Sequence, residues 1–439
     1  MKMQFGFTDD YIIGTGGLAL AGHLIKKINF VQKVNQVNLK EAHNPEIRNS
    51  DVLVSYIGLL CQGKNDFDHI EAFRDDTFYR QALGIRKVPS SPTLRQRLDT
   101  ARDSFREIIL NENANLLLAG APTLTSCSTG HAVIDIDVSP FDNSNTKKEG
   151  VGYTYKKVDG YAPIFAYLGE EGYCINLQLR EGTQHCQCDT EGFLADTIKL
   201  AKKVTKKPLL VRMDSGNDSG SNIRIMQAEQ TKADYIIKRN LRREKKSAWL
   251  AVAQTNGTIS EPREGKKVWT GSLMTQPKGN TEKSRMIYKV TERTMTPDGQ
   301  LLMCPEIEVE AWWTSLTNVT EEAIIKLYKE HGTSEQFHSE IKTDMDLERL
   351  PSGKFKTNSL VLELAMIAYN ILRILGQESI QAPGIPLRKK AARRRIRTVI
   401  QNLITIAGKV VKHAGQIKLC FSKKECWAVP WMAINAKLA

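Results

Sequence analysis

The sequence predicts an α/β protein: a mixed sheet that is interrupted by a β-rich insertion and flanked by helical N-terminal and C-terminal regions. Apolar residues recur at helical spacing from residue 1 to about 128, and the pattern changes to that of strands from His131 onward. Turn pairs such as Asn256-Gly257 then separate β-prone segments between residues 241 and 312. The 439 residues, 41% of them hydrophobic, are enough to bury several cores and exclude a chain that is disordered throughout.

Residues 1–128 are predicted to form a helical region that binds DNA. Ser91-Pro92 offers an N-cap and a first-turn proline to a helix whose opening turns carry Arg95, Gln96 and Arg97. A basic helix of this kind can lie in a DNA groove. The solvated face of an ordinary helix explains the same residues about as well.

Residues 129–240 are predicted to form the first part of a central sheet. Alternating residues predict a strand over 133–138, and Gly169-Glu170-Glu171-Gly172 predicts the turn of a hairpin between 161–168 and 173–180. Helix and strand then alternate, with helix 191–204, strand 208–213, helix 222–231 and strand 233–238. The order β-β-β-α-β-α-β indicates an antiparallel hairpin followed by parallel crossovers.

The rest of the chain divides into three segments. The β-rich insertion covers residues 241–312. A long helical pattern resumes at Thr320, and with an apolar helix over 360–375 it makes residues 313–383 the second part of the core. Residues 384–439 are expected to form a basic helical C-terminal region, whose first basic side chains are Arg388, Lys389, Lys390, Arg393, Arg394, Arg395 and Arg397.

The balance of charge indicates a polyanionic partner. Lys and Arg number 62 against 49 Asp and Glu, which leaves a formal charge of +13, so nucleic acid is the first candidate. No span approaches the roughly 20 apolar residues of a transmembrane helix, and the N-terminal apolar run lacks the basic flank of a signal peptide. Eight Cys in a chain of this length suit a reducing compartment. We therefore expect a cytoplasmic protein without a membrane partner.

Two acids lie where strands are predicted to end. Asp137 closes the strand 133–138 and shares one face of it with Asp135. Asp214 follows an apolar strand and precedes Ser215-Gly216, so it reaches the rim of the sheet, where ligand sites of open α/β sheets form. Each acid could instead cap the next turn or pair with an Arg, and for a single acid that explanation is the commoner one.

A third candidate lies in the segment 328–342. At 3.6 residues per turn, one stripe of a single helix, about 60° wide, would carry Tyr328, His331, Glu335 and Lys342. A carboxylate among a phenol, an imidazole and an ammonium suits a metal ion and the phosphates of a nucleic acid. On its own, a solvated amphipathic face with Glu-Lys pairing is the commoner explanation.

Taken together, these segments resemble the insertion-sequence DDE transposases. The resemblance rests on Asp137 in Ile-Asp-Ile-Asp-Val-Ser, Asp214 in Arg-Met-Asp-Ser-Gly, and Glu335 in a Tyr-x2-(Arg)-x3-Glu-x6-Lys pattern. It covers most of the chain from about 130 to 380, and the basic C-terminal segment is also similar to that of the family. It implies a ribonuclease H-like catalytic core in two parts, 129–240 and 313–383, with the β-strand insertion before the last acid.

The resemblance also implies an activity and its partners. In that family the three acids bind two divalent metal ions, so Asp137, Asp214 and Glu335 are expected to hold two Mg²⁺ (or Mn²⁺), hard cations that prefer carboxylate oxygens. Two such ions can stabilise the attacking and the leaving oxygen of phosphodiester cleavage and of strand transfer into target DNA. The implied partners are double-stranded DNA, as transposon-end inverted repeats and as target, and a second copy of the chain in a homodimer on DNA. The implied location is a bacterial cytoplasm, at the nucleoid.

Two positions depart from a simple match. The family's Tyr, Arg and Lys help to hold the transposon end, which assigns this role to Tyr328, to Lys342 and, in place of Arg, to His331. A His is mostly neutral at pH 7 and cannot form the bidentate fork of Arg, so weaker end binding is expected. Asp135 is a rival of Asp137; we prefer Asp137 because the family's acid precedes a small residue and then Thr or Ser.

Further side chains are expected to contact DNA. One basic cluster leads from the last core strand into the insertion and contains Lys238, Arg239, Arg242 and Arg243. Arg394 and Arg395 provide a second cluster in the C-terminal segment, and solvated charge is the alternative explanation of both. The resemblance also suggests that one of Trp269, Trp312 and Trp313 stacks on a displaced base, although strand packing is expected for at least two of them.

Two other functions stay open. A structure-selective nuclease on the same core would cut DNA without joining it, and a transposase-derived DNA-binding protein would be catalytically silent. Nucleotide hydrolysis is not indicated, since the sequence has no Walker A motif. A zinc site is not indicated either, because Cys186 and Cys188 lack the second ligand pair that it requires.

Overall fold

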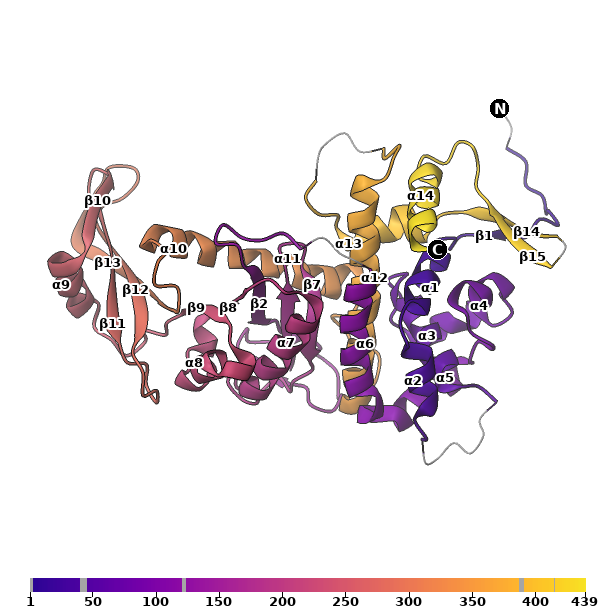
Figure 1. The fold of residues 1–439 in the computed structure, drawn as a ribbon, viewed down its shortest axis with the longest axis horizontal. Helices are drawn as coiled ribbons and strands as arrows, with labels where there is room; N and C mark the ends of the chain where they lie inside the picture. Colours follow the sequence, from indigo (N-terminus) through magenta and orange to yellow (C-terminus); the bar gives the residue numbers. More distant parts are fainter. Residues whose placement is uncertain (1–2, 40–45, 121–123, 387–390, 414) are drawn as a thin grey trace.

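The protein is elongated, with a β-rich lobe at one end and both termini at the other (Figure 1). The computed structural model describes residues 3–39, 46–120, 124–386, 391–413 and 415–439. Arg388, Lys389 and Lys390 of the basic C-terminal segment lie outside these residues. The central sheet and the helices packed on it occupy the middle of the molecule (Figure 1).

Five strands form the core of a nine-stranded mixed sheet: β2 (Ala132–Val138), β6 (Ile164–Leu168), β7 (Tyr173–Gln178), β8 (Leu209–Met213) and β9 (Asp234–Lys238). Their order is β7-β6-β2-β8-β9, in which β6 is antiparallel to both neighbours while β2, β8 and β9 are parallel. Gly169 and Gly172 have φ angles of +76° and +73° and form the predicted hairpin turn. The predicted fold class, a mixed α/β sheet of ribonuclease H-like order, is confirmed.

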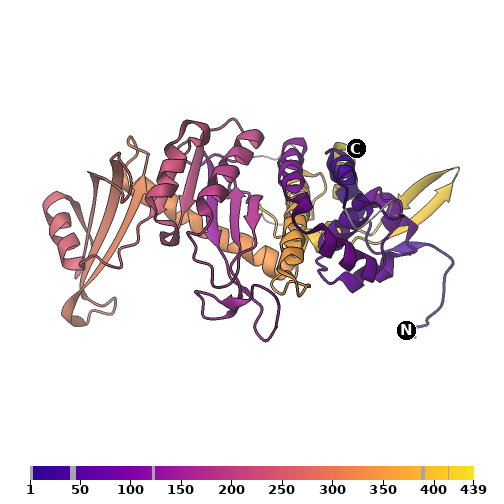
Figure 2. The same cartoon turned by 90° about the horizontal axis from the view of Figure 1, so that it is seen from below.

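Short helices and a small sheet surround these strands. The connections after β7 contain α7 (Thr190–Val204), η3 (Ser215–Asn217), α8 (Gly220–Gln227) and η4 (Glu229–Thr231). Between β2 and β6, a separate three-stranded sheet of order β3-β5-β4 contains β3 (Phe141–Asp142), β4 (Gly152–Tyr153) and β5 (Asp159–Tyr161). The purple segment of Figure 2 that contains this small sheet projects away from the body of the molecule.

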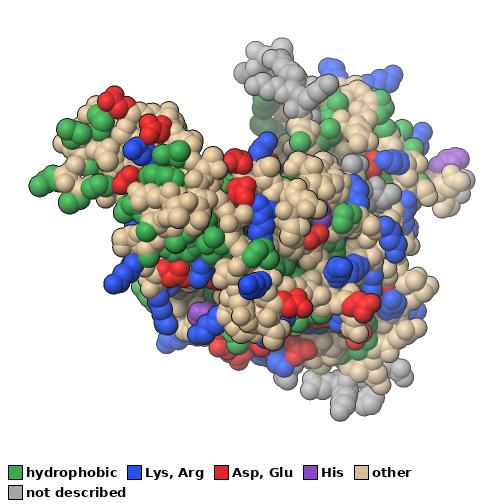
Figure 3. Space-filling view, turned by 60° about the vertical axis from the view of Figure 1, so that its left-hand side comes forward, with side chains coloured by type: hydrophobic (Ala, Val, Ile, Leu, Met, Phe, Trp, Pro, Cys, Tyr) green, Lys and Arg blue, Asp and Glu red, His purple; other side chains and the backbone are tan. Residues whose placement is uncertain are grey.

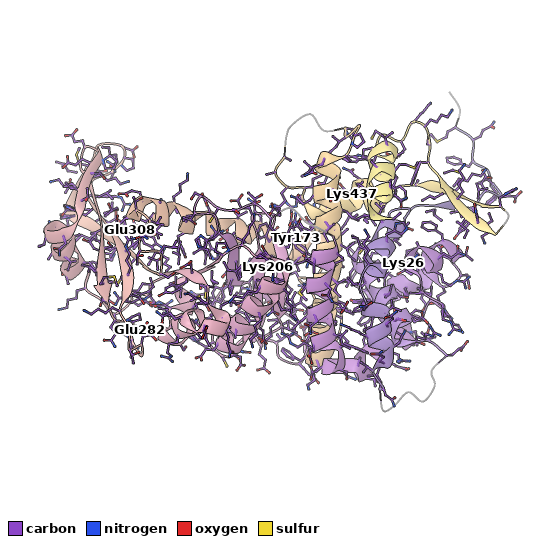
Figure 4. All side chains as sticks on the ribbon, viewed as in Figure 1. Lys26, Tyr173, Lys206, Glu282, Glu308 and Lys437 are labelled. Atoms are coloured by element: carbon purple, nitrogen blue, oxygen red, sulfur yellow. The ribbon has the colours of Figure 1, made fainter. Side chains whose placement is uncertain are left out.

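The insertion extends the core sheet. It contains α9 (Lys246–Asn256), β10 (Thr258–Arg263), β11 (Lys266–Thr275), β12 (Ser284–Met295) and β13 (Leu301–Thr314). β13 pairs antiparallel with β9, with Trp313 opposite Ile237, so the four inserted strands continue the same sheet. Glu308 of β13 lies in this lobe (Figure 4), where it pairs with Arg293 of β12 at 2.7 Å.

The second part of the core begins with one helical path whose pitch changes twice. It consists of α10 (Glu321–Lys329), the 3-10 turn η5 (Glu330–Thr333), α11 (Ser334–Ser339) and the π turn η6 (Glu340–Asp344). The long helix α12 (Phe355–Gln381) follows and packs on β7, where Asn370 accepts from the backbone N–H of Cys174 at 2.9 Å. Tyr173, at the start of β7, lies at this junction (Figure 4).

One described helix, α12, is long and apolar enough to cross a membrane by length and composition, although 94% of its apolar window is buried inside the protein. The expectation that no span of this length exists was therefore wrong. Its burial is typical of the central helix of a folded core, where an all-round apolar surface is covered by other elements.

The N-terminal region is helical, as expected. It contains α1 (Leu18–Lys26), α2 (Phe30–Gln36), α3 (Asn49–Leu60), η1 (Phe67–Phe73), α4 (Thr77–Leu83), α5 (Ser91–Ala101), η2 (Arg102–Phe105) and α6 (Arg106–Ala119). A short strand, β1 (Ile12–Ile13), precedes these helices.

The C-terminal region differs from the helical prediction. It contains α13 (Ile396–Val399), the π turn η7 (Ile400–Ile404), β14 (Gly408–His413), β15 (Gln416–Cys420) and α14 (Ala428–Leu438). β14 pairs with both β15 and β1, which forms a three-stranded sheet from the two ends of the chain. Helical periodicity did not foresee this sheet, because β1 supplies one of its edges from nearly 400 residues away.

Candidate active site

Asp137 and Asp214 lie side by side at the ends of adjacent parallel strands. Ile136 of β2 is in register with Met213 of β8, so the next residue on each strand is an aspartate. Neighbouring strands are about 4.8 Å apart, which holds the two carboxylates close together. Burial, followed by the charge of Asp137, raises the pKa of Asp214. Two acids that repel one another are thus held at the rim of the sheet.

Hydrogen bonds hold both aspartates, and the imidazole of His338 lies 3.4 Å from Asp137. Asp214 accepts from the side chain of Asn217 at 2.8 Å and from the backbone N–H of Gly216 at 3.1 Å. Asp137 accepts from the backbone N–H of Val138 at 2.8 Å, and its side chain is 24% exposed. Among the residues described, neither carboxylate forms an ion pair with a Lys or an Arg.

Asp135, the rival of Asp137, is occupied by a buried ion pair. Arg212 of β8 donates to both of its carboxylate oxygens, at 2.6 and 2.7 Å, and His331 binds one of them through Nδ1 at 2.8 Å. Burial opposes the ionised form, but Arg212 and His331 hold the pKa of Asp135 below its ordinary value. This carboxylate is neutralised by the protein itself.

Glu335 is not gathered with the two aspartates in the described residues. It lies on α11 with an exposed side chain that makes no hydrogen bond or ion pair with the other described residues, and it lines an open pocket of about 470 Å³ together with Arg393 and Arg395. No group of three or more His, Cys, Asp or Glu side chains is gathered as a metal site in the described ranges. The structure therefore brings two of the three predicted acids together.

The hydroxyl of Tyr155 lies beside the strand that presents Asp137. It donates to the backbone carbonyl of Val138 at 2.8 Å. Burial of this hydroxyl raises its pKa, and the negative charges of Asp137, Asp214 and Glu335 act in the same direction. The side chain of Glu335 is exposed, and such a side chain changes rotamer within nanoseconds.

Tyr328 and Lys342, two other residues of the signature, contact neighbouring side chains and backbone. Tyr328 packs between Trp312 and His331, with ring centroids 5.8 Å from each. Lys342 donates to the carbonyl of Pro140 at 2.5 Å, and its ammonium lies over the ring of Phe141. Because the 3-10 and π turns change the pitch, the four signature positions do not follow one regular α-helical stripe.

His331, which we expect to contact a phosphate, is buried against Asp135 in the structure. The His331 side chain is only 9% exposed, and Asp135, whose charge outweighs the effect of burial, raises its pKa. It acts as a buried partner of the Asp135–Arg212 pair rather than as a surface cation. From the sequence, only the replacement of the family's Arg by His331 was visible. The pairing of His331 with Asp135 and Arg212 was not visible, because these residues meet only in the folded protein.

The predicted basic clusters are only partly available to DNA. In the first cluster, Lys238 pairs with Glu310 at 3.0 Å and Arg239 pairs with Glu244 at 2.6 Å, whereas Arg242 and Arg243 are exposed. Lys and Arg side chains alternate with acidic ones on the face drawn in Figure 3, so no single basic patch dominates it.

In the second cluster, Arg394, which we expect to contact DNA, packs inside the protein. Its side chain is buried, since the residue is 4% exposed, and its guanidinium stacks on Trp427 at 4.4 Å. Arg395 is half-exposed but binds Asp344 at 2.8 Å.

The insertion tryptophans pack in the protein. Trp269, Trp312 and Trp313 are all buried, and the indole N–H of Trp313 donates to Asp218 at 3.0 Å. The suggestion that one of them stacks on a displaced base therefore finds no exposed ring in this structure.

Two side chains that lie beside the strand of Asp137 were not foreseen from the sequence. His338, three residues after Glu335, is buried with Nε2 3.4 Å from a carboxylate oxygen of Asp137, and it holds the pKa of that acid down although burial opposes this. The sequence could have indicated His338, because a residue three positions after Glu335 lies on the same side of a helix. Tyr155 gave no signal, because its loop position does not reveal which strand end its hydroxyl reaches.

The donor set fits divalent cations. Asp137 and Asp214 supply only oxygen atoms, which is the chemistry that Mg²⁺ and Mn²⁺ require. The neighbouring Asp135 does not fit, because Arg212 occupies both of its oxygens.

The chain matches a known protein family over its whole length. The model of the family described as transposase DDE domain group 1 matches residues 1–439. No curated protein matches this sequence. Among solved structures, the chain is similar to a piggyBac transposase in a synaptic complex with hairpin DNA, with 13% identity and a TM-score of 0.41 over 89% of this chain and 80% of that chain.

Proposed function

The chain belongs to the transposase DDE domain group 1 family, and from that premise we propose that it cuts DNA at the ends of a mobile element and joins those ends to target DNA. It is a DNA transposase, an enzyme that acts on DNA, and its family generally uses divalent metal ions. The finer parts of the proposal are the identity of its metal ligands, the number of ions and the DNA contacts.

The observation that carries the proposal is the pairing of Asp137 with Asp214. Two repelling carboxylates at a sheet rim cost free energy, so a protein that keeps them gains from a cation between them. Glu335 is proposed as the third ligand and two Mg²⁺ or Mn²⁺ as the ions. When bound, such ions activate a water or a 3′-hydroxyl as nucleophile and stabilise the leaving oxygen of a phosphodiester.

The protein's own residues orient the site. Arg212 and His331 neutralise Asp135 and thereby fix the strand that presents Asp137. His338 lies 3.4 Å from a carboxylate oxygen of Asp137 and supports that side chain. Lys342 lies near the same strand end through the carbonyl of Pro140, and we propose that its ammonium binds a phosphate beside the scissile bond.

DNA is expected to contact the exposed cations around this site. Arg242 and Arg243 at the entrance of the insertion are proposed to bind the DNA backbone. Terminal inverted repeats as the bound sequence, and a homodimer as the form that pairs two ends, complete the proposal. The helical N-terminal region would supply the specific contacts.

The test uses oligonucleotides that contain the inverted repeats flanking the reading frame. Intact and pre-cleaved ends are incubated with Mg²⁺ and a target plasmid, and cleavage and joining are scored separately. We expect both reactions with the wild-type protein and neither with Asp214→Asn, while the matched variant Asp218→Asn, which alters an acid outside the pair, retains them. Cleavage without joining would support the nuclease, and DNA binding without either reaction would support the silent DNA-binding protein.

A further inference from the structure

A short hairpin beside the three acids carries two exposed tyrosines. It joins β4 to β5 of the small sheet that projects in Figure 2. Tyr153 and Tyr155 are 61% and 64% exposed, although large aromatic rings usually gain free energy by burial. Two exposed rings two residues apart are available to a partner that stacks on them.

The ring of Tyr155 is held in place at its far end. Its hydroxyl donates to the carbonyl of Val138, the residue that follows Asp137 on β2. The ring is thus anchored to the strand that presents the first acid, while most of its surface remains in solvent. Stacking of a base on the Tyr155 ring would cost little conformational entropy, because the hydrogen bond already fixes the side chain.

The backbone of the hairpin is tightly held as well. The backbone N–H and the hydroxyl of Thr154 both donate to the carbonyl of Val158 at 2.9 Å. Gly160 passes so close to β3 that a Cβ atom there would lie 1.8 Å from the carbonyl oxygen of Phe141. These contacts fix the hairpin on the small sheet, so the tyrosine is presented by a rigid element.

Cations border the ring on the same hairpin. Lys156 and Lys157 directly follow Tyr155 and are exposed. Lys156 lies near enough to Lys342 that its charge, after burial, lowers the pKa of the Lys342 ammonium. Exposed aromatic rings among ammonium groups are typical of surfaces that bind single-stranded nucleic acids, since bases stack on the rings and phosphates pair with the cations.

We propose that Tyr155, with Lys156 and Lys157, forms a stacking site for one unpaired base of the DNA strand whose scissile phosphate lies at Asp137 and Asp214. The proposal deepens the proposed function, because it rests on that function for the identity of the strand. Tyr155 is thereby a positioning residue, which holds the nucleotide next to the reacting phosphate. The buried insertion tryptophans are not available for this role.

Stacking is tested without cleavage and without knowledge of the element ends. The full-length protein is titrated in EDTA against a short single-stranded oligothymidylate with one central 2-aminopurine, whose fluorescence is quenched when it stacks. We expect quenching by the wild-type protein, and at least about a tenfold weaker affinity with loss of quenching for Tyr155→Ala. Tyr155→Phe keeps the ring and should retain the quenching with a smaller loss of affinity.

Matched controls separate this site from general effects. Phe7→Ala removes a still more exposed ring, from the N-terminal end of the molecule, and should change neither quenching nor affinity. Lys156→Gln with Lys157→Gln should weaken binding more than Lys423→Gln with Lys424→Gln, which removes two exposed positive charges elsewhere. Thermal unfolding shows whether each variant is folded.

The outcomes distinguish the stacking site from the proposed function. Absence of quenching with the wild-type protein, or equal quenching with folded Tyr155→Ala, overturns the stacking site. If quenching depends on Tyr155 while the wild-type protein cuts no end-containing DNA, the stacking site stands and the proposed function fails. If both stand, Tyr155→Ala should slow cleavage and Asp214→Asn should abolish it without changing the quenching.

Discussion

Asp135 and Asp137 lie on the same face of one strand, yet the structure predicts opposite consequences for their substitution. Asp137→Asn should reduce DNA cleavage by about 10³-fold or more, because a lost metal ligand removes several kcal/mol of transition-state stabilisation. It should leave the melting temperature unchanged or raise it, since Asp214 loses a repelling neighbour. Asp135→Asn should lower the free energy of unfolding by about 3–5 kcal/mol, because Arg212 becomes an uncompensated buried charge.

Urea denaturation and cleavage rates of the two variants check this prediction. The pair is matched in residue type, strand and face, so each variant is the control for the other. If Asp135→Asn is folded but inactive while Asp137→Asn is active, Asp135 is the metal ligand and the assignment is contradicted.

His331 is expected to act on stability and not on DNA affinity. His331→Gln should lower the free energy of unfolding by about 1–3 kcal/mol, because Asp135 loses a buried partner at 2.8 Å. The folded protein raises the pKa of His331, so this stabilisation is complete below the unfolded pKa of about 6.5 and declines as the pH rises through the folded pKa.

Denaturation at pH 6 and pH 9 measures the difference between the wild type and His331→Gln, which should be smaller at pH 9. The salt dependence of DNA binding should stay the same. A slope of log affinity against log salt that falls by about one would instead identify His331 as a phosphate contact.

The residues that could be predicted are those whose position follows from local pattern. Asp137 and Asp214 each end an apolar strand, and that placement is readable without tertiary information. The burial of His331 and Arg394 was not readable, because their partners Asp135 and Trp427 come from other parts of the fold.

At the scale of elements, the C-terminal segment stabilises the helical path that carries Glu335. Asp344 of η6 is fully buried and lies 2.8 Å from Arg395 and 3.4 Å from Arg397, both half-exposed. Each single substitution by Ala should cost about 1 kcal/mol or less, since the other arginine still faces the carboxylate. The double substitution should cost more than the sum, because a buried charge then has no cation.

A double-mutant cycle from urea denaturation tests this coupling. Additive losses would show that the two arginines act independently. Lys423→Ala with Lys424→Ala provides an additive control pair on the exposed turn after β15.

The order of the core strands was predictable, whereas several other elements, among them the small sheet of β3, β4 and β5, were not. Strand and helix alternate in the chain as they do in the sheet between β2 and β9, so periodicity was sufficient. The β14–β15 hairpin was mistaken for helix because its stability depends on β1. The pitch changes at η5 and η6 were also missed, since they depend on how α10 and α11 pack on the sheet.

For the whole molecule, the insertion and the core form one structure. β13 pairs with β9, so the insertion lobe is fixed to the sheet that ends in Asp137 and Asp214. The sequence indicated a separate β-rich segment, but the edge at which it joins the core is a tertiary pairing that local pattern does not contain. The exposed Arg242 and Arg243 lie in the connection between β9 of the core and α9 of the lobe.

The most direct test of the central claim is the anomalous X-ray signal of Mn²⁺ in crystals of the full-length protein, compared with crystals of Asp214→Asn. The account predicts a peak about 2.1 Å from carboxylate oxygens of both Asp137 and Asp214, with Glu335 turned toward it, and no such peak in the variant. A saturating Mn²⁺ soak that leaves these oxygens without a peak, or that places the metal on other residues, would contradict it.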